Sequence, residues 1–275
     1  MASVPASPTP TIPARRERVF LRGLADLDVP ADVVETGQGR PVVFLHGLVG
    51  LNDHWEDVVQ RIAHRCRCVL LQLPLLDLKD DDCSIDGATA LTARFLDRFR
   101  TEKPVIVGNS FGGHVALRLA VEQPDLLGGL VLAGSSGLIE KSMVSDIQLR
   151  PSREWLTRKI GELFHDKAKM NPADVERAYL ELNDRAHARA MVRLSRTARR
   201  NHLGDEMHRI TCPTLIVWGK QDIVTPPEAA TEMNARIRGS RLVWFEQCGH
   251  APMIEAAEPF GEAMLAFLDD LDARG

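Results

Sequence analysis

Six short runs of apolar residues recur along the chain, and each ends in a small or turn-forming residue. Continuous runs of this length, rich in β-branched residues and leucine, are typical of parallel strands that are covered on both faces. The predicted strands cover residues 41–45, 67–71, 104–107, 129–133, 213–218 and 241–245.

Amphipathic patterns with helical spacing separate most of these runs. An alternation of strands and helices predicts an α/β fold with a doubly wound, mostly parallel sheet, in which ligands bind outside the carboxyl ends of the strands. The predicted helices cover residues 52–63, 84–99, 111–122, 226–237 and 258–271.

The alternation stops between residues 137 and 207, where every pattern is helical. Helices are expected at residues 152–164, from residue 171 onward, and at residues 184–200, and Asn171 followed by Pro172 is a typical helix start. An all-helical insertion of this size predicts a cap, or lid, over the strand ends. The core is then formed by residues 18–136 and 208–275.

The N-terminal residues 1–17 are rich in Pro, Ser, Thr and Ala before a cluster of arginines. This composition predicts a disordered tail. A signal peptide is not expected, because the apolar stretch after the arginines is too short to form its core.

Composition narrows the class of function. The chain has 275 residues, 44% of them hydrophobic, and a net charge of −4, so it can bury a large core and has no basic field for nucleic acid. Its five irregularly spaced cysteines indicate reduced thiols in a cytoplasmic protein. We expect a small-molecule substrate, no metal or other cofactor, no nucleic-acid partner and no membrane association, and we leave a homodimer open.

The strongest chemical signal surrounds Ser110, which follows a predicted strand and precedes a predicted helix. A nucleophile on so sharp a turn needs small residues two positions before and after it, and Gly108 and Gly112 meet this need. A glycine-rich turn without catalysis is the competing interpretation. The strand, turn and helix in succession favour a nucleophile.

A serine hydroxyl needs a base, and the base needs an acid that fixes its tautomer. His250 follows the last predicted strand, and Asp222 follows the strand at 213–218. The chain order of Ser110, Asp222 and His250 is the order that this fold requires. For Asp222, a loop aspartate that forms only a salt bridge is the competing interpretation.

An oxyanion needs two backbone donors. The amide of Phe111, at the start of the helix after the nucleophile, is the first candidate. The second should lie in the turn after the first central strand, where we choose Leu48 and keep Val49 as the fallback. His46 is expected to brace this turn by hydrogen bonding.

Together these motifs resemble the α/β-hydrolase superfamily over roughly residues 32–271. They are most similar to the branch that contains carboxylesterases and the meta-cleavage-product hydrolases, which break carbon–carbon bonds in acidic diketones. In that branch the residue matching Asn109 lines the substrate site, and an arginine of the lid binds the acid end of the substrate. The resemblance implies these roles for Asn109 and Arg177.

The chain departs from that branch at three places. Ala251 follows the catalytic histidine where tryptophan is usual, Leu48 and Val49 interrupt a glycine-rich turn, and the turn after residue 72 lacks the usual pattern. These departures leave ester hydrolysis intact, so we expect a serine hydrolase of small carboxylic esters. Carbon–carbon hydrolysis is the alternative, and a non-catalytic small-molecule binding protein is the third hypothesis.

Overall fold

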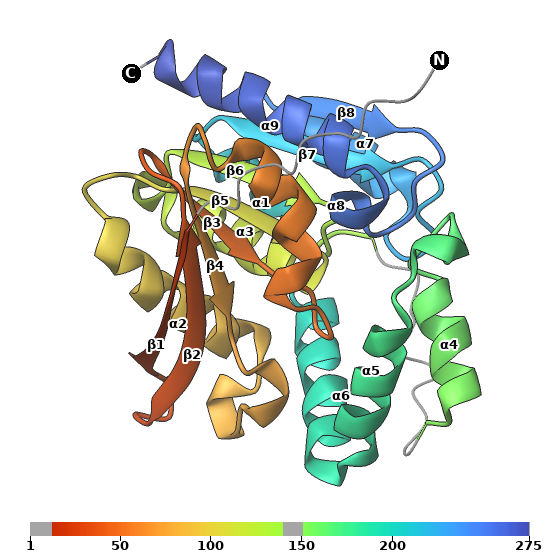
Figure 1. The fold of residues 1–275 in the computed structure, drawn as a ribbon. Helices are drawn as coiled ribbons and strands as arrows, with labels where there is room; N and C mark the ends of the chain where they lie inside the picture. The colour runs from red at the N-terminus through yellow and green to blue at the C-terminus, as the bar shows by residue number, and fades with distance from the viewer. Residues whose placement is uncertain (1–12, 140–150, 275) are drawn as a thin grey trace.

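The computed structural model describes residues 13–139 and 151–274. The first 12 residues of the predicted tail and residues 140–150 of the predicted lid lie outside these ranges. Within them the chain forms an eight-stranded sheet with helices on both faces, which confirms the predicted α/β fold (Figure 1).

All six predicted strands are present, and they pair in parallel with one another. The sheet order is β1-β2-β4-β3-β5-β6-β7-β8, and only β1 and β2 run antiparallel to their neighbours. The carboxyl ends of β3 to β8 therefore share one edge. The strands are β3 (Pro41–Leu45), β4 (Arg67–Gln72), β5 (Val105–Asn109), β6 (Gly129–Ala133), β7 (Thr214–Gly219) and β8 (Arg241–Phe245).

Alternate strand residues enter two separate cores, one on each face of the sheet. In β3, Val42 and Phe44 join the core beneath α1 (Glu56–Ile62) and α9 (Ala257–Asp272). Val43 and Leu45 join the other core. Because side chains alternate along a strand and both faces are buried, each strand reads as an unbroken apolar run. The helices of the second face are α2 (Ile85–Leu96), α3 (Phe111–Glu122) and α7 (Pro227–Arg236).

The N-terminal boundary of the core differs from the prediction. β1 (Ala14–Arg22) pairs with β2 (Asp28–Thr36) as an antiparallel hairpin at the edge of the sheet, so residues 14–17 belong to a strand and not to the tail. In β1 the exposed side chains of Arg18, Phe20 and Arg22 alternate with the more buried Val19 and Leu21. This half-exposed edge pattern lacks the continuous apolar run that marked the other strands.

Between β6 and β7, three helices form a segment that we call the helical insertion (residues 151–200). They are α4 (Arg153–Gly161), α5 (Pro172–Asn183) and α6 (Arg185–Arg200), and Figure 1 shows them grouped at the lower right while α9 crosses the top of the view. α5 begins as predicted, with the Asn171 side chain capping a helix whose first residue is Pro172.

The insertion packs on the α/β core through α6 and through Phe164, which follows α4, and it keeps a small core of its own. Leu156, Val175, Ala178 and Leu182 form a separate cluster between α4 and α5, whereas Leu194 on α6 joins the main core. None of the helices in the described ranges combines the length and the apolar character that crossing a membrane requires.

Candidate active site

Ser110 occupies the sharp turn between β5 and α3. Its backbone lies at φ 53° and ψ −118°, a strained conformation for a residue other than glycine. A Cβ at Gly108 would lie 2.3 Å from the Gly112 carbonyl oxygen, and a Cβ at Gly112 would lie 2.6 Å from the Leu45 carbonyl oxygen. The two glycines are therefore required by the close approach of backbone around this turn.

The first turn of α3 presents unsatisfied donors beside Ser110. No side chain caps this helix, and Phe111 is its first residue. The free amides at a helix start carry partial positive charge, which favours a developing anion nearby.

The loop after β3 is braced by His46, as the sequence predicted. His46 Nδ1 lies 2.7 Å from the Gly47 carbonyl oxygen, and His46 Nε2 lies 3.0 Å from the side-chain nitrogen Nε2 of Gln72. Burial lowers the pKa of His46 to about 4, so the ring is neutral near pH 7. Because a carbonyl only accepts, Nδ1 carries the proton and Nε2 accepts from Gln72.

This brace orients the peptide that contains the predicted second oxyanion donor. The Gly47 carbonyl accepts from His46 Nδ1 and, at 3.1 Å, from the Gly50 amide. In a trans peptide the N–H points opposite to the C=O, so the Leu48 amide is turned away from His46. Leu48 and Phe111 line the same pocket.

His250 lies in the loop between β8 and α8 (Pro252–Glu255), and its ring is buried against Asp222. Its Nδ1 lies 2.9 Å from Asp222 Oδ2. An ionised carboxylate only accepts, so Nδ1 donates and Nε2 is left as an acceptor.

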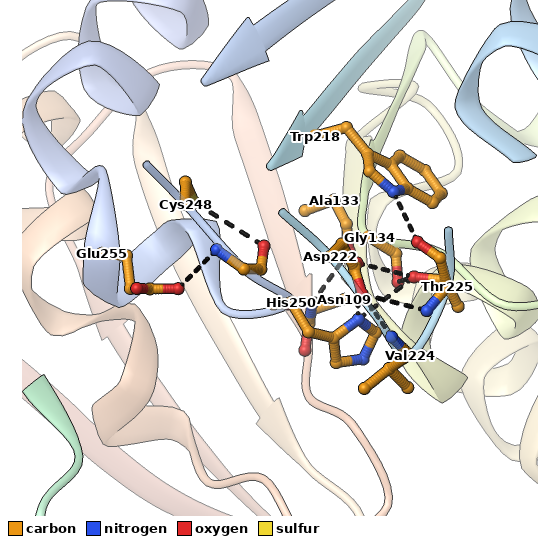
Figure 2. A network of polar contacts seen from close by, with 11 residues as sticks. Asn109, Ala133, Gly134, Trp218, Asp222, Val224, Thr225, Cys248, His250 and Glu255 are labelled. Carbon is orange, nitrogen blue, oxygen red and sulfur yellow. Dashed lines mark hydrogen bonds and ion pairs between the residues drawn. The ribbon is translucent and has the colours of Figure 1, made fainter. Parts of the chain in front are cut away.

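Asp222 is held by a dense set of donors (Figure 2). Its Oδ1 accepts from the amides of Val224 at 2.8 Å and Thr225 at 3.0 Å, which is the usual turn geometry of an aspartate side chain. Its Oδ2 accepts from the Thr225 hydroxyl at 2.8 Å as well as from His250. Hydrogen bonds to both oxygens therefore fix the orientation of the Asp222 carboxylate.

Thr225 is a site residue that the sequence analysis missed. Its fully buried hydroxyl contacts Asp222, lies 3.1 Å from His250 Nδ1 and 3.2 Å from the Gly134 carbonyl oxygen. Trp218 Nε1 donates to the Thr225 carbonyl at 2.9 Å. A hydroxyl residue three positions after a loop aspartate was the available signal, because such spacing places it within the same turn.

Asn109 lines the pocket but commits its amide nitrogen elsewhere. Nδ2 donates to the carbonyl oxygens of Ala133 at 2.9 Å and His250 at 3.1 Å. The side chain therefore ties the end of β5 to the end of β6 and to the loop between β8 and α8 that carries His250, which we call the histidine loop. The resemblance implied contact with substrate, whereas these bonds show a structural use of Nδ2.

Ser110 and His250 border a single pocket of about 200 Å³ whose wall is mostly apolar. Within the described ranges, neither Ser110 Oγ nor His250 Nε2 has a hydrogen-bond partner, so this conformation holds the two side chains in one pocket without a direct bond. In free enzymes such bonds are often long and shorten in the substrate complex. The insertion contributes the outer wall through Trp155, Leu182 and Met191.

Arg177, on α5, adds a cation to this wall. Its Nη2 donates to the Val49 carbonyl at 3.1 Å and to Asp174 Oδ1 at 2.9 Å. Its Nη1 is buried without a partner. A buried donor without a partner is costly.

Cys248 places a thiol close to the candidate base. Burial raises the pKa of Cys248, two residues before His250, to about 12, so its thiol stays protonated near pH 7. Among the described residues, no group of three His, Cys, Asp or Glu side chains is arranged to hold a metal ion.

Known proteins of similar sequence and structure are hydrolases. A 2-hydroxy-6-oxo-6-(2'-aminophenyl)hexa-2,4-dienoic acid hydrolase of Metapseudomonas resinovorans is 29% identical over 249 residues, which is 86% of each chain. A pimeloyl-[acyl-carrier protein] methyl ester esterase of Nitrosomonas europaea is 28% identical over 82% of this chain and 94% of the esterase.

A solved structure shows the same relationship. A serine hydrolase involved in carbazole degradation superposes with a TM-score of 0.77 at 27% identity, over 93% of this chain and 99% of that one. Residues 42–263 match the profile of the Alpha/beta hydrolase family. Because the match covers most of the chain, this protein belongs to the Alpha/beta hydrolase family.

Proposed function

We propose that the protein is a serine hydrolase in which Ser110 is the nucleophile, His250 the base and Asp222 the acid. The observation that carries this proposal is the buried 2.9 Å bond from His250 Nδ1 to Asp222, with the ring at the edge of the pocket that contains Ser110. The bond leaves Nε2 unprotonated and able to take the proton from Ser110 Oγ.

The first step adds the serine to a carbonyl carbon. As Ser110 Oγ forms the new bond, its proton moves to His250 Nε2, and Asp222 stabilises the resulting imidazolium. The carbonyl oxygen becomes an oxyanion, and the amides of Phe111 and Leu48 are its proposed donors. When the leaving group departs, the imidazolium returns the proton to it. Water then releases the acyl group by the same steps in reverse.

The helical insertion is proposed to act as the lid of this pocket. α4, α5 and α6 all contribute side chains to its wall. A lid of this kind excludes water and shapes the space for the substrate.

Ester hydrolysis is the first candidate reaction. The pocket is predominantly apolar and is lined by the cationic side chains of Lys159 and Arg177, of which Arg177 has an unpartnered Nη1, so it suits a small ester with an apolar body and an anionic group. A methyl ester esterase is among the relatives, which is consistent with this chemistry.

Carbon–carbon hydrolysis of an acidic diketone is the second candidate. The buried, unpartnered Nη1 of Arg177 favours a carboxylate-bearing substrate, and several relatives act on such dienoates. The same oxyanion donors and base would serve this reaction.

A substrate panel separates the two candidates. Purified protein is assayed with p-nitrophenyl acetate, a methyl monoester of a dicarboxylic acid, and 2-hydroxy-6-oxo-6-phenylhexa-2,4-dienoate, the substrate named for another relative. Turnover of esters only supports the first candidate, and faster turnover of the dienoate supports the second. Ser110→Ala should abolish turnover of whichever substrate is used, and full turnover in this variant would reject the proposal.

Arg177→Met tests recognition of the anionic group. Its KM should rise for acidic substrates about 10- to 100-fold and stay near the wild-type value for p-nitrophenyl acetate, because a charged hydrogen bond is lost only with the acids. Arg189→Met, on the exposed face of α6, is the matched control. Equal effects of Arg177→Met on both classes would contradict this role.

A further inference from the structure

Glu255 is a buried carboxylate that the proposed chemistry does not use. It ends the short helix α8, five residues after His250, and is 8% exposed. Its Oε2 accepts from the Gly249 amide at 2.7 Å, and its Oε1 accepts from the Asp166 amide at 2.9 Å. A charge is kept in such a place only when hydrogen bonds replace its water, and here both bonds go to backbone.

These two bonds join parts of the fold that are far apart in the chain. Gly249 immediately precedes His250, whereas Asp166 belongs to the helical insertion, after α4. The carboxylate therefore spans the boundary between the histidine loop and the proposed lid. In Figure 2, Glu255 and Asp222 lie on opposite sides of His250.

The same boundary carries further contacts. The His250 amide donates to the Leu163 carbonyl at 2.7 Å, and Lys169 Nζ donates to the Glu255 carbonyl at 2.6 Å. A Cβ at Gly249 would lie 2.7 Å from the Leu163 carbonyl oxygen, so only glycine permits this approach. The segment from residue 163 to 169 and the loop from 249 to 255 are thus joined by several bonds.

His250 is consequently held on three sides. Asp222 binds its ring, Asn109 Nδ2 binds its carbonyl oxygen, and the insertion binds its amide. Asn109 ends β5 and Asp222 lies in the loop after β7, so both belong to the α/β core, whereas the third holder belongs to the insertion. The position of the imidazole relative to Ser110 therefore depends on how the segment 163–169 is seated.

We propose that Glu255 is a positioning residue that couples the helical insertion to His250. By binding Gly249 and Asp166 at once, it holds the histidine loop and the segment 163–169 at a fixed position relative to each other. The imidazole of His250 is then oriented toward Ser110 only when the insertion is packed against this loop. This inference rests on the proposed function of His250.

Glu255→Gln tests the coupling with almost no change in size. One of its two acceptor atoms becomes an NH₂ group that faces a backbone N–H, so one of the two bonds is lost. We expect kcat to fall about 10- to 100-fold with KM within about 2-fold of wild type, because the base is misplaced while the pocket wall is kept. The rate of Ser110 phosphonylation by a fluorophosphonate should fall by the same factor.

Glu258→Gln is the matched control, since it makes the same change three residues later at an exposed position. Lys169→Met supplies a second variant that leaves the carboxylate intact and removes only the Nζ bond to the Glu255 carbonyl. It should slow phosphonylation about 2- to 10-fold. If Glu255→Gln fails to fold, as judged by circular dichroism, Lys169→Met decides the question.

The outcomes separate this inference from the proposed function. If the wild-type protein is not phosphonylated at Ser110, the proposed function fails. If it is, and if folded Glu255→Gln and Lys169→Met react at the wild-type rate, the coupling is refuted while the catalytic assignment stands. A rise in KM with unchanged kcat would likewise refute it, because that result places Glu255 in the shape of the pocket and not in the position of the base.

Discussion

The hydroxyl of Thr225 provides a sharp test of how Asp222 orients the base. Thr225→Val replaces the hydroxyl by a methyl group of similar shape in a fully buried position. The variant removes the 2.8 Å bond to Asp222 Oδ2 and leaves the two backbone bonds to Oδ1 in place. Asp222 Oδ2 then has His250 as its one remaining donor and is freer to rotate.

The size of the effect follows from the kind of bond that is lost. A hydrogen bond to a charged group contributes about 1.5–3 kcal/mol. If the activation free energy rises by this full amount, because His250 carries a positive charge in the transition state, kcat/KM falls about 10- to 150-fold. The assays are ester turnover and the rate of fluorophosphonate labelling, which does not depend on knowing the substrate.

Two further variants make the test specific. Thr225→Ser keeps the hydroxyl and should stay within about 3-fold of wild type, since it loses only one methyl group. Thr231→Val makes the same replacement at an exposed position on α7 and should leave activity unchanged. Wild-type kcat/KM in a folded Thr225→Val protein, or an equal loss in Thr225→Ser, would refute the reasoning.

Three other predictions concern the turn, the acid and the response to pH. Gly112→Ala should abolish activity and lower the yield of folded protein, because its Cβ would lie 2.6 Å from backbone oxygens. Gly161→Ala is the control and should keep full activity, because no atom lies nearer than 3.8 Å to its Cβ. Soluble yield and ester turnover measure both effects. Asp222→Asn should lower kcat about 10⁴-fold without loss of fold, since an amide favours the wrong imidazole tautomer, and ester turnover with circular dichroism measures it. Burial lowers the pKa of His114 to about 4, so the unfolded chain binds more protons between about pH 4 and 6.5, and the fold loses stability as pH falls through that window. His114→Gln should remove about 2 kcal/mol of the loss between pH 8 and pH 5, as measured by urea unfolding, and an unchanged slope would contradict the assignment.

Most of the sheet could be predicted from sequence because its strands are buried on both faces. Their continuous apolar runs, such as that of β5, are a local signal that needs no knowledge of neighbours. The hairpin of β1 and β2 was not predicted, because β1 is an edge strand whose charged residues face solvent. Its pairing with β2 stabilises the strand more than its own composition suggests.

The candidate site divides in the same way. The turn around Ser110 and the loops of Asp222 and His250 follow strands directly, so their arrangement at one edge of the sheet could be inferred from chain order. The role of Glu255 could not, because it depends on Asp166, 89 residues away in the chain. A bond of that kind leaves no spacing or periodicity to detect.

The activation of Ser110 can be tested by mapping the site of fluorophosphonate attachment by mass spectrometry. We predict a single adduct, on the peptide that contains Ser110, and its loss in both Ser110→Ala and His250→Gln. An adduct at another residue, no adduct on folded wild-type protein, or undiminished labelling of His250→Gln would contradict the claim that the buried pair of His250 and Asp222 activates this serine.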